Sequence, residues 1–314
     1  MYVKNIVFGS ILPLSAAALF LFTSCDKDDD DNNSNRTVTE TVVANPDFSL
    51  LETAVGRAQL ATYLGSTNNI TVFAPTNDAF TAAGLTESAI GTTPVATLDA
   101  VLKYHVLAQR IPSSSVPAGP NAEVTTVNGA KAYVTRNNNG VFINGIKVAQ
   151  ADVNATNGVI HVIGSVLMPP SGNIVETAVA NSNLTYLVAA VQRAGASGTD
   201  IAAALSAAGP LTVFAPTNQA FIDAGFPTIA SIQSADPNTI KNILLYHVLN
   251  ARVFSSDLTE GATPATLQGG NVTITLAGGA KVKGAGNSTA AAITGTNIVA
   301  TNGVIHVIDK VLLP

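Results

Sequence analysis

The chain has 314 residues, enough for about two domains. Only 11% of its residues are charged, the formal net charge is −5 and no basic stretch is present. This composition argues against a nucleic-acid partner, which would need a cationic surface. Cys25 is the single cysteine, so neither an intramolecular disulfide nor a cysteine-based metal site can form.

The N-terminal segment has the pattern of an export signal. Residues 6–22 are an apolar run, preceded only by the charge of Lys4, and its length suits the core of a signal peptide spanning residues 1–24. The following Phe22-Thr-Ser-Cys25 resembles the lipobox of bacterial lipoproteins, with Phe22 where leucine is usual. The resemblance implies that Cys25 carries acyl chains that anchor the protein in a membrane. The alternative is a signal anchor with an incidental cysteine.

Residues 25–38 are expected to form an acidic, solvated tether. The stretch Asp26-Lys-Asp-Asp-Asp-Asp31 carries repelling charges, and the tether has almost no apolar side chain to bury. The stretch resembles the lysine-plus-acidic export address of some surface lipoproteins, which predicts an outer-membrane lipoprotein on the cell surface. A competing rule takes Asp26 beside the cysteine as a retention signal, so a periplasm-facing location remains the alternative.

Helical and extended patterns then alternate along the chain. Apolar spacing predicts a helix over residues 48–64, and residues 70–74 predict a buried strand that ends at Pro75. Thr76 or Asn77 is expected to cap a short helix. A second amphipathic helix is predicted over residues 97–107, with His105 on its apolar stripe and Tyr104 near the edge of that stripe.

Strands follow in the second half of this unit. Residues 131–136, 141–149 and 159–167 predict three strands, the last apolar on both faces and therefore covered on both sides. Asn157-Gly158 predicts a hairpin turn, because both residues tolerate positive φ. The same order then recurs, with a first helix predicted over residues 174–194 and a glycine-punctuated hairpin over residues 271–283.

Three blocks of sequence occur twice, which indicates a tandem duplication. The spacing between the copies of these blocks rises from 141 to 145 residues, far above the period of solenoids, and an earlier match of Glu40-Thr-Val-Val-Ala-Asn45 with Glu176-Thr-Ala-Val-Ala-Asn181 is spaced by 136. The blocks of the two copies are Thr71-Val-Phe-Ala-Pro-Thr-Asn-Asp-Ala-Phe80 and Thr212-Val-Phe-Ala-Pro-Thr-Asn-Gln-Ala-Phe221, Tyr104-His-Val-Leu107 and Tyr246-His-Val-Leu249, and Ala155-Thr-Asn-Gly-Val-Ile-His-Val-Ile163 and Ala300-Thr-Asn-Gly-Val-Ile-His-Val-Ile308.

These blocks resemble the fasciclin-like domain family over residues 39–169 and 172–314. One departure is Gly164, where the second copy has the more usual Asp309. The resemblance implies an α+β fold of two tandem fasciclin-like domains, each a β-sandwich or wedge with packed helices. It also implies adhesion or extracellular-matrix binding without catalysis.

The four histidines are the candidate site residues. His105 and His247, with Tyr104 and Tyr246, are candidate binding or structural residues, while His161 and His306 are expected to be structural. No carboxylate or thiol stands at metal-ligand spacing in both copies, so we expect buried neutral histidines bonded to backbone or to a tyrosine hydroxyl. No catalytic residue, metal or cofactor is predicted.

Three functions remain open on this reading. The first is a non-catalytic, surface-anchored lipoprotein that binds extracellular protein or matrix. The second is a carbohydrate-binding lipoprotein of a nutrient-uptake system, and the third is a hydrolase whose site the sequence does not reveal. No Gly-x-Ser-x-Gly elbow or phosphate-binding loop is present to support the third. Neither the partner nor the oligomeric state can be deduced from the sequence.

Overall fold

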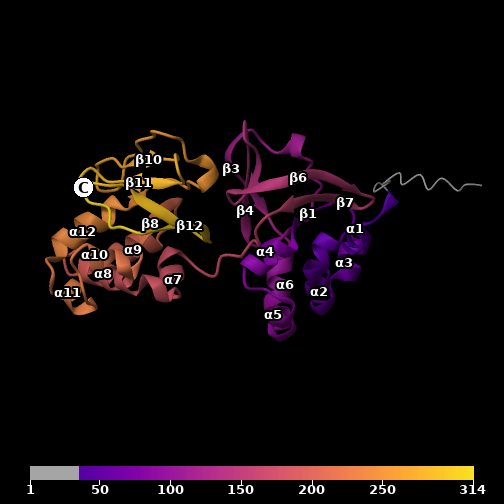
Figure 1. Cartoon of the computed structure of the whole chain (residues 1–314), viewed down its shortest axis with the longest axis horizontal. Coiled ribbons are helices and arrows are strands. Elements are labelled where there is room, and N and C mark those ends of the chain that lie inside the picture. The colour runs from indigo at the N-terminus through magenta and orange to yellow at the C-terminus, as the bar shows by residue number, and fades with distance from the viewer. Residues whose placement is uncertain (1–34) are drawn as a thin grey trace, which may run out of the picture. The chain divides into compact units, whose positions relative to one another are not determined.

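The computed structural model describes residues 35–314, and the signal segment, Cys25 and most of the tether lie outside this range. Residues 33–314 form one compact unit. Each repeat combines one β-sheet with a group of helices that gather on one side of that sheet (Figure 1). The α+β fold of two tandem domains with curled sheets and packed helices is therefore confirmed.

The helices of the first repeat are short and well capped. Thr37 and Glu40 form a capping box at the first helix, in which each side chain bonds the other residue's backbone N–H. Thr76, rather than Asn77, caps α4. The helices are α1 (Val38–Ala44), α2 (Ser49–Arg57), α3 (Ala61–Ser66), α4 (Asn77–Ala82), α5 (Glu87–Thr92) and α6 (Val95–Tyr104).

The second repeat has the corresponding helices, and its first is capped by the same device, with Asn173 and Glu176 in the capping box. Its helices are α7 (Ile174–Val179), the short 3-10 helix η4 (Ser182–Leu184), α8 (Thr185–Gly195), α9 (Ile201–Ser206), α10 (Asn218–Asp223), α11 (Ile229–Ser234) and α12 (Pro237–Tyr246).

Two predicted helices are wrong in their continuity. The helix expected over residues 48–64 is broken between α2 and α3, where Gln59 has φ 57° and cannot continue a right-handed helix. The helix expected over residues 174–194 is broken at Asn181, whose side chain accepts a hydrogen bond from the N–H of Asn183 and starts a new helical segment. In the second repeat α7 packs against α8, whereas in the first repeat α2 and α3 both pack against α1.

The sheet of each repeat is organised around one parallel pair. In the first repeat β1 (Ile70–Pro75) runs parallel to β7 (Gly158–Ile163) and antiparallel to β2 (Val106–Leu107). The full order is β2-β1-β7-β6-β5-β4-β3. The remaining strands are β3 (Gly119–Thr125), β4 (Lys131–Asn137), β5 (Gly140–Ile143) and β6 (Ile146–Ala155).

The second sheet repeats this arrangement with the order β10-β11-β12-β13-β8-β9. The hairpin predicted over residues 271–283 is confirmed by the antiparallel pairing of β10 with β11. The strands are β8 (Leu211–Pro216), β9 (Val248–Leu249), β10 (Thr273–Thr275), β11 (Lys281–Lys283), β12 (Ala291–Ala300) and β13 (Gly303–Ile308).

Each central strand separates two apolar clusters. Along β1, Ile70 and Val72 pack into the cluster under the helices, whereas Phe73 packs into a second cluster on the opposite face. This alternation follows from the period of two along a strand. The expectation that β7 is covered on both faces is confirmed, because five of its six residues are buried.

Two of the Asn-Gly dipeptides of the first repeat lie at chain turns but differ in backbone conformation. Asn144 and Gly145, inside the strand expected over residues 141–149, have φ of 48° and 74° and turn the chain between β5 and β6. The hairpin expected at Asn157-Gly158 is present, since Ala155 of β6 pairs with Gly158 of β7 and the turn lies at residues 156–157, but neither Asn157 nor Gly158 has the expected positive φ. Gly158 is instead required because an added Cβ would lie 2.5 Å from the carbonyl oxygen of Ile70.

Asn157 also makes three long-range hydrogen bonds that lock the fold. Its side-chain oxygen accepts from the N–H of Val38, 2.8 Å away, and its side-chain nitrogen donates to the carbonyls of Leu64 and Thr67. Asn302 makes the equivalent bonds to Ile174, Leu205 and Ala207 in the second repeat. We call each set the asparagine clamp.

Replacement of Asn157 by Ala should lower the free energy of unfolding of the first repeat by about 2–4 kcal/mol, because buried backbone groups lose their partners. Urea unfolding measures this change. Asn138 is exposed, so Asn138→Ala is the matched control and should change stability by less than about 0.5 kcal/mol. Equal stability of the two variants would contradict a stabilising clamp.

Candidate functional site

The Tyr-His pair lies at the end of α6 in the first repeat and of α12 in the second. The helix predicted over residues 97–107 is shorter than expected and ends at Tyr104, so that His105 is its C-terminal cap and the next residues form β2. His247 occupies the same position after α12. The pair therefore sits where a helix turns directly into a sheet strand, at the boundary between the two apolar clusters.

Both ring nitrogens of His105 are bonded to the backbone. Nδ1 lies 2.8 Å from the carbonyl oxygen of Val101, and the N–H of Leu167 donates to Nε2 at 2.8 Å. The proton must therefore be on Nδ1. His247 repeats the pattern with Ile243 and Leu312. Each ring joins the last turn of a helix to the end of its repeat.

The electrostatics favour the neutral ring. His105 and His247 are 2% and 1% exposed. Burial lowers the pKa of each to about 4, although the bond from Nδ1 to the helix carbonyl opposes that shift. A neutral ring with both nitrogens bonded has no lone pair free for a metal. This is the environment expected of a structural histidine, and the role itself stays a prediction.

The tyrosines of the pair point into the second apolar cluster, rather than lying at the edge of the helix stripe. Tyr104 is fully buried; its hydroxyl donates to the carbonyl of Lys131 and accepts from the side chain of Asn144. Burial raises the pKa of Tyr104 to about 12. Tyr246 donates to the carbonyl of Asn271. These tyrosines are bonded to the sheet and not to the neighbouring histidines.

His161 and His306 lie on the central strands β7 and β13. Nε2 of His161 donates to the carbonyl of Ile111, and its Nδ1 accepts from the N–H of Asp152. His306 bonds Val253 and Asn297 in the same way. Burial lowers the pKa of both rings. These hydrogen bonds are also internal to the protein. Each repeat therefore contains two buried histidines whose ring nitrogens bond to the backbone of the same repeat.

Asp152 and Asn297 are residues that the sequence analysis did not identify. Each has φ near 60° and interrupts the pairing of β6 or β12 with its neighbour, which places its N–H opposite the histidine. Each also accepts a hydrogen bond from the N–H of a serine, Ser113 or Ser255. A left-handed Asp or Asn inside a strand carries no distinctive local motif, and only the match between the two copies could have indicated it.

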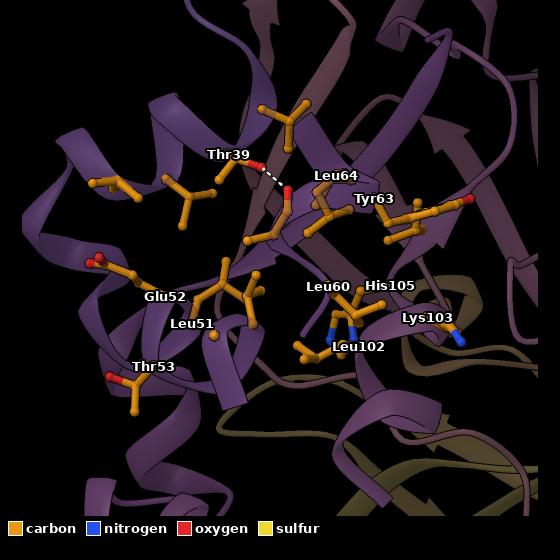
Figure 2. A pocket seen from close by; sticks show the side chains of 18 of the residues that line it. Thr39, Leu51, Glu52, Thr53, Leu60, Tyr63, Leu64, Leu102, Lys103 and His105 are labelled. Carbon is orange, nitrogen blue, oxygen red and sulfur yellow. Dashed lines mark hydrogen bonds between the residues drawn. The ribbon is translucent and has the colours of Figure 1, made fainter. Parts of the chain in front are cut away.

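A cavity of about 480 Å³ opens beside His105 between α1, α2, α3 and α6. Figure 2 shows Leu51, Leu64 and Leu102 facing the cavity, with Glu52 and Lys103 at its margins. The second repeat has a smaller cavity of about 190 Å³ beside His247. Each cavity is thus lined in part by the histidine of the Tyr-His pair of its repeat.

Within residues 35–314, no three His, Cys, Asp or Glu side chains gather in a way that could hold a metal ion. In the same range, no helix has the length and apolar character needed to cross a bilayer. The four histidines are part of a buried, hydrogen-bonded framework, and an apolar cavity lies beside His105 and beside His247.

The α+β unit occurs twice, and in each copy a helix ends at a Tyr-His pair. The protein is therefore of the class built from tandem copies of one domain. The Fasciclin domain model matches residues 46–169 and 182–314. The chain belongs to the fasciclin domain family. Fasciclin domains are associated with cell adhesion and matrix binding, and they are generally non-enzymatic.

Individual proteins resemble the chain over one or both repeats. "Transforming growth factor-beta-induced protein ig-h3" of Sus scrofa is 28% identical over 250 residues, which are 78% of this chain and 35% of that protein. "Protein sll1483" of Synechocystis sp. is 40% identical over 136 residues, 43% of this chain and 74% of that protein. The chain spans about a third of the length of the first of these relatives.

A solved structure of a FAS1 domain pair from the insect cell adhesion molecule fasciclin I is also similar. It covers 84% of this chain and 96% of its own, with 20% sequence identity and a TM-score of 0.41.

Replacement of His105 by Ala should lower the free energy of unfolding by about 2–4 kcal/mol, because it widens the cavity and leaves two backbone groups unpaired. Denaturant unfolding measures the loss. Lys103→Ala is the control on the same helix, since its exposed ion pair with Asp99 should contribute less than about 1 kcal/mol. A His105→Ala variant of parental stability with lost partner binding would make His105 a functional residue.

Stability should fall as the pH is lowered from about 6.5 to about 4. The folded-state pKa values of His105 and His247 lie below the unfolded value of 6.5, so the unfolded chain binds more protons in this window. Each histidine should account for about 3 kcal/mol at most. Urea unfolding at pH 7, 5.5 and 4.5 tests this. A His105→Asn, His247→Asn double variant should have a shallower pH dependence, and an unchanged slope would contradict the assignment.

Proposed function

We propose that this protein is a non-catalytic lipoprotein that mediates adhesion by binding extracellular protein or matrix through its two fasciclin domains. The observation that supports the proposal most is the family match, which extends over both repeats. Acyl chains on Cys25 would hold the protein in the membrane, and the acidic tether would separate the domains from the bilayer.

The internal bonding of the histidines agrees with a binding role rather than catalysis. A general base needs a reachable lone pair, whereas both nitrogens of His105 and of His247 are used by the protein. Partner binding would therefore use the surface of the domains. The sparse charge of the chain favours contacts by neutral polar and apolar groups over electrostatic steering.

Cells that make the full chain should adhere to at least one protein of a panel of immobilised matrix proteins, and cells lacking the chain should not. The soluble unit of residues 33–314 should compete for the same surface, because it contains both repeats as one compact unit. Adhesion assays and surface plasmon resonance measure the two effects. Unchanged adhesion without the chain would contradict the proposal, and selective binding on a glycan array would support carbohydrate uptake instead.

Surface location is a separate prediction. Protease treatment of intact cells should release the domains, and replacement of Asp28 to Asp31 by Ala should then protect them, because recognition of the acidic run by export machinery would be lost. Immunoblotting of shaved cells measures release. A periplasmic marker must stay intact as a control. If the unaltered protein resists the protease, the surface location is wrong and the periplasm-facing alternative replaces it.

A further inference from the structure

We propose that the cavity of the first repeat is a binding site for an uncharged, hydrocarbon-rich small molecule, such as a long-chain alcohol or ester. The first observation is that the cavity is built twice. Val43 and Gly56 line it in the first repeat, and Val179 and Gln192, each 136 positions later, line its counterpart in the second. The hollow is therefore part of the repeated architecture and does not depend on one irregular loop.

The size of the first cavity suits a small ligand. Its volume of about 480 Å³ falls within the range of roughly 300–1,000 Å³ that is usual for small-molecule sites. The second cavity, at about 190 Å³, falls below this range. We therefore expect one ligand per chain, held by the first repeat.

The lining favours an uncharged ligand. Glu52 and Lys103 lie at the margins of the cavity (Figure 2), and Lys103 already forms an ion pair with Asp99 at 2.9 Å. The ring of His105 offers no hydrogen bond, because both nitrogens are bonded to backbone groups. The interior presents leucine and valine side chains instead. A ligand that buried a charge there would lose its hydration without gaining a partner.

Exposed apolar side chains also mark the mouth. Val43 is 54% exposed, and Val179 at the same position of the second repeat is 60% exposed, although both belong to short helices with otherwise buried apolar faces. A hydrocarbon in the cavity would cover Val43 as well as the interior. Covering such surface favours binding, because it removes apolar area from water.

The linings of the two cavities differ in side-chain size at one matched helix position. Gly56 on α2 lines the large cavity, and a Cβ added there would meet no atom within 4 Å. Gln192 stands at the corresponding position of α8 and lines the small cavity. Both positions are solvent-exposed at the rim of their cavity, with no side chain in the first repeat and a glutamine in the second. Gly56 is therefore a position where an added side chain can obstruct the first cavity.

The test uses the soluble unit of residues 33–314, with N-phenyl-1-naphthylamine as an uncharged fluorescent probe. We expect one saturable site per chain, from which 1-dodecanol displaces the probe more strongly than dodecanoate does. Gly56→Leu should weaken probe binding by about tenfold or more, since the new side chain fills the cavity. Gly91→Leu is the matched control, because Gly91 also lies in a helix with free space around it but lines neither cavity.

Gln192→Ala provides a second test, in which binding is expected to increase instead of decrease. The shorter side chain should enlarge the second cavity and raise the number of probe molecules bound per chain from one to two. The proposal is overturned if Gly56→Leu and Gly91→Leu bind the probe equally, or if dodecanoate displaces it as well as dodecanol. If Gly56→Leu fails to fold, the result for Gln192→Ala decides by itself. A Gln192→Ala variant that still binds one probe molecule per chain would then overturn the proposal.

Discussion

The asparagine clamp is the interaction on which the arrangement of each repeat depends. Asn157 follows β6, yet its amide bonds the start of α1 and the loop after α3, so one buried side chain holds the hairpin, the first helix and the entry to β1 together. Gly158 then lets β7 approach Ile70 closely enough to pair in parallel with β1. An exposed asparagine could not do this, because water would compete for the same groups.

The position of the first helices also affects the cavity that they line. The clamp ties the start of α1 to the end of α3, and both helices line the cavity. In a well-packed core such a hollow lowers stability, since its lining loses dispersion contacts. Its retention in both repeats is consistent with a use for the space in at least one of them.

The sequence allowed the fold class and the repeat to be predicted because the duplicated blocks coincide with the most buried elements, β1 and β7 and their counterparts. Helix continuity could not be predicted, since Gln59 adopts positive φ under tertiary constraint and has no local signal for it. The dipeptide Asn-Gly illustrates the same limit: both Asn144-Gly145 and Asn157-Gly158 lie at hairpin turns, but only the first has positive φ. The bonds of Asn157 to distant elements have no local signal. The apolar positions of the histidines were predictable, whereas their backbone partners, such as Leu167, come from distant parts of the chain.

The bond from Leu167 to His105 has a consequence for how a repeat is made. The ring is satisfied only when the last residues of the repeat arrive, and β1 likewise gains its parallel partner, Ile160 beside Val72, only near the end of the repeat. Contacts of such high sequence separation form slowly, because the closure of a long loop precedes them. A repeat therefore cannot complete its sheet during synthesis until nearly all of it has emerged from the ribosome, and until then the growing chain lacks the parallel pair at the centre of its fold.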